Sequence, residues 1–315
     1  MQFFKDPKVN FLSKRKMFAF ASAVYIVIGL LATFILGPKL GIDFQGGTEI
    51  AVEFSQSVNT NDIRNAVEQT GMTGSEIKSF GGDNQHLIRV KESEKSAEAV
   101  QEALEKAFPN QNIEVLKIDK IGPKIGSELF FDAILAVILA VLGILIYIAF
   151  RFEFAFGLGA IIALVHDVIV AFTVIVIVHH TGLINLEINQ AILAAMLTVV
   201  GYSINDTVII FDRIRENRER QKGMNFIKMI NLSINEVLNR TINTSLTTSL
   251  VLITLKFFGG AVLQGFAFTM LIGIITGTYS SWYIASSFVV WYLGKYKKID
   301  LEKGYAPKSA VGVKP

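Results

Sequence analysis

The chain has no cysteine in its 315 residues, which excludes both a disulfide framework and a zinc site built on thiolates. It also lacks a set of zinc ligands, a nucleotide-binding loop, and the serine–lysine or paired-aspartate arrangement of a protease. We therefore expect a protein that is not an enzyme and that holds no metal ion or cofactor.

A cleavable signal peptide is also missing from the sequence. The first apolar run, residues 17–36, is too long for the apolar region of a signal peptide, and no small-residue cleavage site follows it. We therefore expect this run to remain in the membrane as an anchor.

Apolar residues dominate what is present. They make up 51% of the chain, and the mean hydropathy of +0.47 is unlike that of ordinary soluble domains. A run of roughly 18 apolar residues can span a bilayer. The sequence contains six such runs, at 17–36, 129–149, 154–178, 188–211, 241–259 and 264–293. It therefore predicts a polytopic α-helical membrane protein with six transmembrane helices.

Positive charge is distributed unevenly between these runs. Lysine and arginine cluster in residues 1–16, 213–228 and 294–315, whereas the loop 179–187 has neither. Because cytoplasmic loops carry an excess of these residues, both termini are predicted to be cytoplasmic. The long segment 37–126 then lies outside the cell membrane.

The remaining segments follow from the same topology. Residues 127–293 are predicted to form a bundle of five transmembrane helices, interrupted by a cytoplasmic amphipathic segment at 213–239. Within it, residues 224–239 should form a helix on the inner membrane surface. The arginines before it fit a topology signal that contacts lipid headgroups, and nucleic-acid binding fits them poorly.

The outside segment 37–126 has the pattern of a small α+β domain. Strands are expected near 47–55, 75–80, 86–90 and 113–121, with one helix after the first strand and another after the third. This βαββαβ order is that of the ferredoxin-like fold. Because the segment has no cluster of ligands or nucleophiles, we expect it to serve as an interaction surface.

Two charged residues interrupt the apolar runs at similar depth. Asp206 and its neighbour Asn205 lie in the fourth run, and Arg240 opens the fifth. A carboxylate at membrane depth costs several kcal/mol unless it is paired, protonated or in contact with water. An Asp206–Arg240 pair across adjacent helices would offset that cost, either as part of proton or ion coupling or as a static pair that fixes helix register. The candidate coupling residues are Asp206, Arg240, Asn205 and Asp167.

Other polar residues in the runs follow helical spacing. Asp167, beside His166, lies near the middle of the third run, where a relay and a static buried carboxylate are both possible. A polar intramembrane face is predicted from Thr198, Tyr202, Asn243, Thr244, Thr247 and Thr248. In the sixth run, Gly265, Thr269, Gly273 and Gly277 recur every four residues, which predicts close helix packing.

Four sequence blocks together carry a family resemblance. They are GIDFQGGT at 41–48, HD at 166–167, VGYSINDT at 200–207, and NRT at 239–241. The chain resembles the SecF family of protein-export membrane subunits from residue 1 to about residue 295. The family's motif loop corresponds here to Gly41, Asp43, Phe44, Gly46 and Gly47.

The resemblance implies partners and an energy source. SecF proteins work with SecD on a separate chain, and with the SecYEG translocon and its cytosolic motor SecA. They promote late, ATP-independent steps of export of an unfolded polypeptide across the bacterial or archaeal cytoplasmic membrane. The proton motive force drives these steps, and sodium is the alternative coupling ion. The family's intramembrane charges correspond to Asp206 and Arg240.

The resemblance also leaves two rival functions to test. SecD and SecF resemble the resistance–nodulation–division transporters, whose unit has twelve spans, so six spans make half a unit. An exporter of small molecules or lipids is one rival, although segment 37–126 is small for a capture domain. A purely structural assembly subunit, whose charges only fix packing, is the other.

Overall fold

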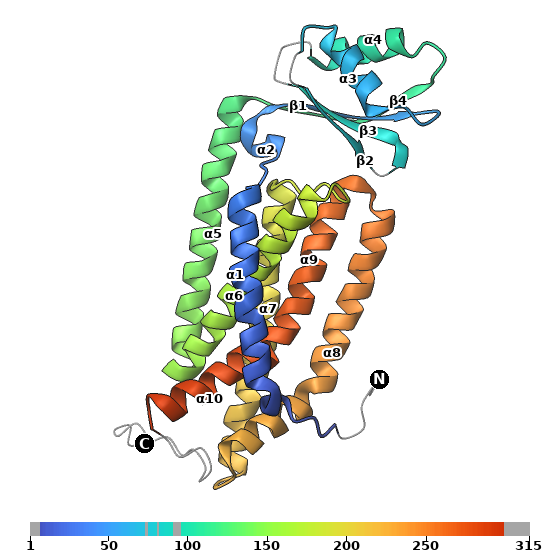
Figure 1. The fold of residues 1–315 in the computed structure, drawn as a ribbon. Coiled ribbons are helices and arrows are strands. Elements are labelled where there is room, and N and C mark those ends of the chain that lie inside the picture. The colour runs from blue at the N-terminus through green and yellow to red at the C-terminus, as the bar shows by residue number, and fades with distance from the viewer. Residues whose placement is uncertain (1–6, 73–74, 81, 91–95, 299–315) are drawn as a thin grey trace.

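The structure is a computed structural model that describes residues 7–298 except 73–74, 81 and 91–95. A bundle of long helices carries a four-stranded sheet at one end (Figure 1). The end of α10 lies at the opposite end of the bundle, as does the start of α1 (Figure 1). The first residues of the predicted N-terminal segment and most of the predicted basic tail lie outside the described residues.

The bundle consists of long helices and short helical segments. They are η1 (Phe11–Lys14), α1 (Arg15–Leu36), α2 (Ile42–Gln45), α5 (Pro123–Arg151), α6 (Phe154–His180), α7 (Gln190–Arg220), α8 (Phe226–Phe258), α9 (Gly260–Ser280), η2 (Ser281–Ala285) and α10 (Ser286–Lys295). In the described part of the chain, four helical segments are long and apolar enough to cross a membrane: 11–36, 124–151, 154–180 and 190–220.

Residues 213–239, predicted to form a cytoplasmic amphipathic segment, belong mostly to the long helices α7 and α8. The arginine-rich stretch is not a loop, because α7 continues through it to Arg220. Residues 224–239 are not a separate helix on the membrane surface but the first half of α8, which runs for 33 residues without glycine or proline. Phe226, Ile230 and Ile234 are fully buried because the extension of α7 gives them a protein surface to pack against.

The predicted sixth run is also not one regular helix. It is divided into α9, the π-helical turn η2, and α10. A π-helical turn inserts an extra residue into the helical repeat, so it changes which side chains face the neighbouring helices.

The outer domain has the predicted order of strands and helices. It contains β1 (Gly47–Phe54), α3 (Thr60–Glu68), β2 (Glu76–Phe80), β3 (Gly82–Val90), α4 (Ser96–Ala107) and β4 (Ile113–Ile121). The sheet order is β2-β3-β1-β4, with every neighbouring pair antiparallel. Ile50 and Phe54 on one face pack against Ile63 of α3 and Leu104 of α4. The other face lies toward the bundle (Figure 1).

An ion-pair network joins this sheet to the bundle. Glu187, in the loop between α6 and α7, is only 5% exposed and pairs with Arg89 of β3. Its other oxygen accepts a hydrogen bond from Lys78 Nζ of β2 at 2.7 Å. Arg89 also pairs with Glu49 of β1 at 2.7 Å. Burial opposes ionisation of Glu187, but Arg89 and Lys78 outweigh it and hold the pKa of Glu187 below its usual value.

Small residues allow α9 to approach α7 closely, as the sequence predicts. A Cβ at Gly273 would overlap the side chain of Val199, and one at Gly277 would lie 3.1 Å from the backbone of Ser203. Valine is stiff at its first side-chain torsion, so it cannot easily rotate away. The seam therefore fixes the distance between the two helices that carry the site described below.

We predict that Gly273→Ala destabilises the protein by about 1–3 kcal/mol through overpacking. Gly143→Ala is the matched control, because a Cβ at Gly143 of α5 meets no atom within 4 Å. Thermal unfolding in detergent should show a lower midpoint for the first variant only. Adding Val199→Ala should recover most of the loss. Equal midpoints for the two single variants would contradict a tight seam.

A second prediction concerns Glu187. Because its folded-state pKa is lowered, its stabilising contribution is complete above about pH 4.5 and is lost as the pH falls through the folded pKa. Glu187→Gln should remove about 1–3 kcal/mol at neutral pH, since it leaves buried donors without a charged acceptor. Hydrogen exchange of β2, β3 and the 181–189 loop should rise, whereas Glu102→Gln, at an exposed pair with Lys106, should change nothing.

Candidate ion-coupling site in the helix bundle

Asp167 of α6 is completely buried and lies at the meeting point of three helices. Its Oδ1 is 2.8 Å from His166 Nδ1. Its Oδ2 accepts hydrogen bonds from Ser203 Oγ of α7 at 2.5 Å and from Ser280 Oγ of α9 at 2.6 Å. The carboxylate is thus well supplied with donors and ties α6, α7 and α9 together.

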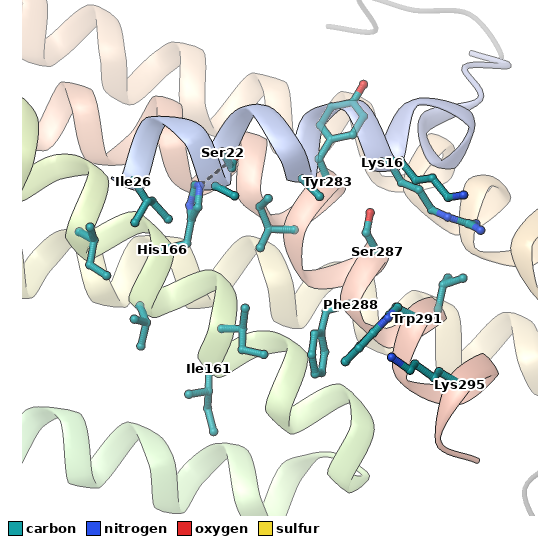
Figure 2. Close-up of a pocket in the computed structure, with 18 of the residues that line it drawn as sticks. Lys16, Ser22, Ile26, Ile161, His166, Tyr283, Ser287, Phe288, Trp291 and Lys295 are labelled. Atoms are coloured by element: carbon teal, nitrogen blue, oxygen red, sulfur yellow. Dashed lines mark hydrogen bonds between the residues drawn. The ribbon is translucent and has the colours of Figure 1, made fainter. Parts of the chain in front are cut away.

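The same network extends through His166 to α1. His166 Nε2 is 3.1 Å from Ser22 Oγ, which is 2.7 Å from the Tyr279 hydroxyl of α9. Figure 2 shows the His166–Ser22 contact, with His166 directed toward α1. The sequence identified Asp167 and His166 but missed the hydroxyl partners. Ser203 lies in the VGYSINDT block, whereas Ser22 and Ser280 belong to no such block and carry no signal of their own.

Asp206 has a different environment on the same helix α7. Its side chain is 6% exposed, and it accepts one hydrogen bond, from Thr278 Oγ1 of α9 at 3.3 Å. The Thr278 hydroxyl also contacts Ser245 Oγ of α8 at 2.7 Å. A carboxylate has about four lone-pair sites, so Asp206 is poorly supplied with donors compared with Asp167.

Arg240 lies on α8 and is exposed at the surface of this chain. In the described part of the chain no ion pair joins it to Asp206, so the predicted pair is not formed in this conformation. The two charges are therefore brought to the same region of the bundle but are not in direct contact.

The predicted polar intramembrane face is largely uncovered in this chain. On α7, Thr198, Tyr202 and Asn205 are exposed, and on α8 so are Thr244 and Thr247. Asn243 and Thr248 are half-buried, and Thr248 Oγ1 is 3.0 Å from the Tyr202 hydroxyl. The sequence led us to expect this face inside the bundle, but the described part of the chain leaves it exposed.

The motif loop forms the junction between α1, the sheet and α7. Gly41 N donates to Ile188 O at 2.9 Å, and Asp43 Oδ2 accepts from Gln190 N at 2.8 Å, at the start of α7. Gly46 and Gly47 have φ angles of +75° and +131°, which favour glycine. Phe44 packs edge-on against Phe130 of α5. This loop therefore has a structural role beside the Glu187 network.

Two protein-family models match most of the chain. Residues 99–295 match the model described as "Protein export membrane protein SecD/SecF, C-terminal". Residues 31–58 match the SecD/SecF GG motif, which includes the junction loop.

Comparison with whole proteins extends the match. The chain is 40% identical to protein translocase subunit SecF of Calditerrivibrio nitroreducens over 90% of its length and 94% of that protein. It is 36% identical to the same subunit of Helicobacter pylori, over 96% of this chain and 94% of that one.

A solved structure has the same fold and a longer chain. The crystal structure of SecDF, a translocon-associated membrane protein from Thermus thermophilus, superposes with a TM-score of 0.80 at 34% identity. The match covers 92% of this chain but only 39% of the SecDF chain. From these matches, the chain belongs to the SecF family of protein translocase subunits.

Proposed function

We propose that this chain is one half of a SecD–SecF complex, and that it uses the proton motive force to promote late steps of polypeptide export. Its family functions in protein export, and the names of its relatives describe transport rather than catalysis.

The observation that carries the proposal is the contrast between the two buried carboxylates. In the part of the chain that the structure describes, Asp167 has three hydrogen-bond partners, whereas Asp206 has one long hydrogen bond and no ion pair. A buried charge with so few partners is costly in a membrane, and protonation removes that cost. Asp206 is therefore the group whose proton exchange changes the packing of α7, α8 and α9, while Asp167 and its partners hold the bundle together.

The energy available is sufficient for such a change. One charge that moves through 100 mV of membrane potential gains about 2.3 kcal/mol, which shifts a two-state equilibrium by more than tenfold. In the ionised state Asp206 attracts Arg240 across the α7–α8 interface, and in the protonated state it releases Arg240. The resulting movement of the helices changes the position of the outer domain through the junction loop and the Glu187 network. Sodium is the alternative ion.

The topology that we propose has six spans, with α8 and the α9–η2–α10 unit as the fifth and sixth. The outer domain is ferredoxin-like and extracytoplasmic, and both termini lie in the cytoplasm of a bacterial or archaeal cell. Its strand order and antiparallel pairing support the ferredoxin-like assignment. The exported polypeptide reaches this domain from SecYEG, while SecA supplies the ATP-driven step.

The partner face follows from the uncovered polar residues of α7 and α8. Hydroxyl, amide and guanidinium groups facing lipid would be costly, so a second membrane protein must cover Tyr202, Asn205 and Arg240. SecD is the partner that fits, because the SecDF chain of the solved structure is more than twice as long as the part matched here.

We predict that Asp206→Asn abolishes the gradient-dependent part of export, a loss of at least tenfold, and leaves SecD association intact. The matched control is Asp212→Asn, six residues further along α7, where the carboxylate is paired with Arg151 at 2.5 Å outside the buried site. Translocation of a preprotein into vesicles would be measured with and without an imposed proton gradient. Replacing sodium in the buffer distinguishes the two ions.

The rival functions give different results in the same vesicles. If the subunit is only structural, collapsing the gradient leaves its contribution to export unchanged. If it exports small molecules or lipids, cells lacking it accumulate a labelled compound while export of polypeptides stays normal. Near-normal gradient-dependent export by Asp206→Asn would refute the proposed role of Asp206.

The partner face is tested by cross-linking. Since the chain has no cysteine, Tyr202→Cys introduces a single reactive thiol. We predict that it cross-links to SecD carrying single cysteines in its membrane helices. Phe20→Cys, on the exposed side of α1, is the control and should give no such product. Equal cross-linking at both positions would contradict the assignment of the face.

A further inference from the structure

A large groove runs along the membrane part of α1, α6 and α10. Its volume is about 880 Å³, and its walls are mainly aliphatic and aromatic. Three of its lining residues are cations, namely Arg15, Lys16 and Lys295, and none is acidic. In Figure 2, Lys16 and Lys295 lie on opposite sides of one end of the groove, and His166, Ser22 and Ile26 lie at the other end.

The length of the groove corresponds to one leaflet of a bilayer. Lys16 and Ile26 both line it and are ten residues apart on α1, which is about 15 Å along a helix axis. The hydrocarbon core of a bilayer is about 30 Å thick. The groove thus begins at the cationic end of the bundle and ends near its middle, beside the hydrogen bond between Ser22 and His166.

The cationic end has the features of a headgroup site. Arg15, Lys16 and Lys295 form no ion pair with any carboxylate in the described part of the chain. Lys295 Nζ instead lies 5.4 Å from the centre of the Trp291 ring, which holds the cation at the rim. Tryptophan favours the membrane interface, where Trp291 would contact glycerol and headgroup atoms.

The wall close to these cations also contains one unsatisfied polar group. The Ser287 hydroxyl is buried and has no hydrogen-bond partner in the described part of the chain. An apolar occupant alone would leave both this donor and the three cations without acceptors. A ligand with an apolar chain and anionic or ester oxygens at one end would satisfy all of them.

From this arrangement we infer that the groove binds one anionic phospholipid of the inner leaflet. The phosphate lies between Arg15, Lys16 and Lys295, and one acyl chain extends along α1 and α6 to His166. The site is separate from the polar face assigned to SecD, and the inference does not depend on how Asp206 works. Bound lipid also closes the groove beside His166, which keeps water away from the Asp167 network.

The test uses the fluorescence of Trp291. The chain has two tryptophans, and Trp282→Phe leaves Trp291 as the single fluorophore in the groove wall. The full chain is reconstituted in phosphatidylcholine vesicles that contain brominated phosphatidylglycerol or brominated phosphatidylcholine. We expect quenching to give a preference for the anionic lipid of roughly fivefold or more, as expected for cations at an anionic surface.

Two triple variants distinguish lipid binding in the groove from attraction of anionic lipid to other surface cations. Replacing Arg15, Lys16 and Lys295 by glutamine should reduce the preference to about onefold. Replacing Lys8, Lys222 and Lys228, which are exposed and do not line the groove, should leave the preference unchanged. Circular dichroism and the thermal midpoint check that each variant is folded.

Four results would overturn the inference. Equal quenching by both brominated lipids means ordinary annular lipid, and an equal loss in both triple variants means unspecific surface attraction. Relief of quenching by soluble glycerol phosphate means a site for soluble anions. Relief on addition of SecD means that a segment of the partner protein occupies the groove.

Discussion

The arrangement of the bundle depends on satisfying one buried carboxylate. Asp167 is inaccessible to water, so its charge is tolerable only because donors from α6, α7 and α9 converge on it. The donors from α7 and α9 are the short side chains of Ser203 and Ser280, which reach the carboxylate only if the helix backbones approach closely. Gly273 and Gly277 on α9 permit this approach to Val199 and Ser203. The close packing of α9 on α7 and the hydrogen bonds to Asp167 therefore depend on each other.

The close packing of α7 and α9 also fixes the position of Asp206, but it supplies few hydrogen-bond donors to the Asp206 carboxylate. It lies one turn after Ser203 on α7, so the contacts that fix Ser203 also fix the backbone of Asp206 near α9. Among the described residues, only Thr278 donates a hydrogen bond to its carboxylate. The bundle thus combines a rigid region around Asp167 with a neighbouring carboxylate, Asp206, that has few hydrogen-bond partners. Protonation of Asp206 would change the energy of the second region and leave the first unchanged, as a coupled movement requires.

The sequence predicted the parts of this protein that follow from local pattern. The alternation of β1 and the helical spacing of α3 and α4 gave the outer domain, and the four-residue glycine repeat gave the seam. The sequence pattern did not predict features that depend on packing between residues far apart in the chain. The stripe from Phe226 to Leu238 has the same periodicity whether it lies on lipid or on α7, and only the fold shows that α7 extends far enough to cover it. The hydroxyl groups around Asp167 could not be predicted either, because serine and threonine occur throughout the apolar runs.

Two sides of the bundle remain uncovered, and their chemistry is opposite. The side formed by α7 and α8 exposes hydroxyl, amide and guanidinium groups, which lipid tails could not satisfy in the six-span topology that we propose. The side formed by α1, α6 and α10 is aliphatic, with cations only at its end. The proposed SecD partner would satisfy the polar groups of the first side, whereas the proposed lipid would match the second side, apolar along its length and anionic at its head. The Asp167 network lies between the two, because it contacts α7 through Ser203 and reaches the groove through His166 and Ser22.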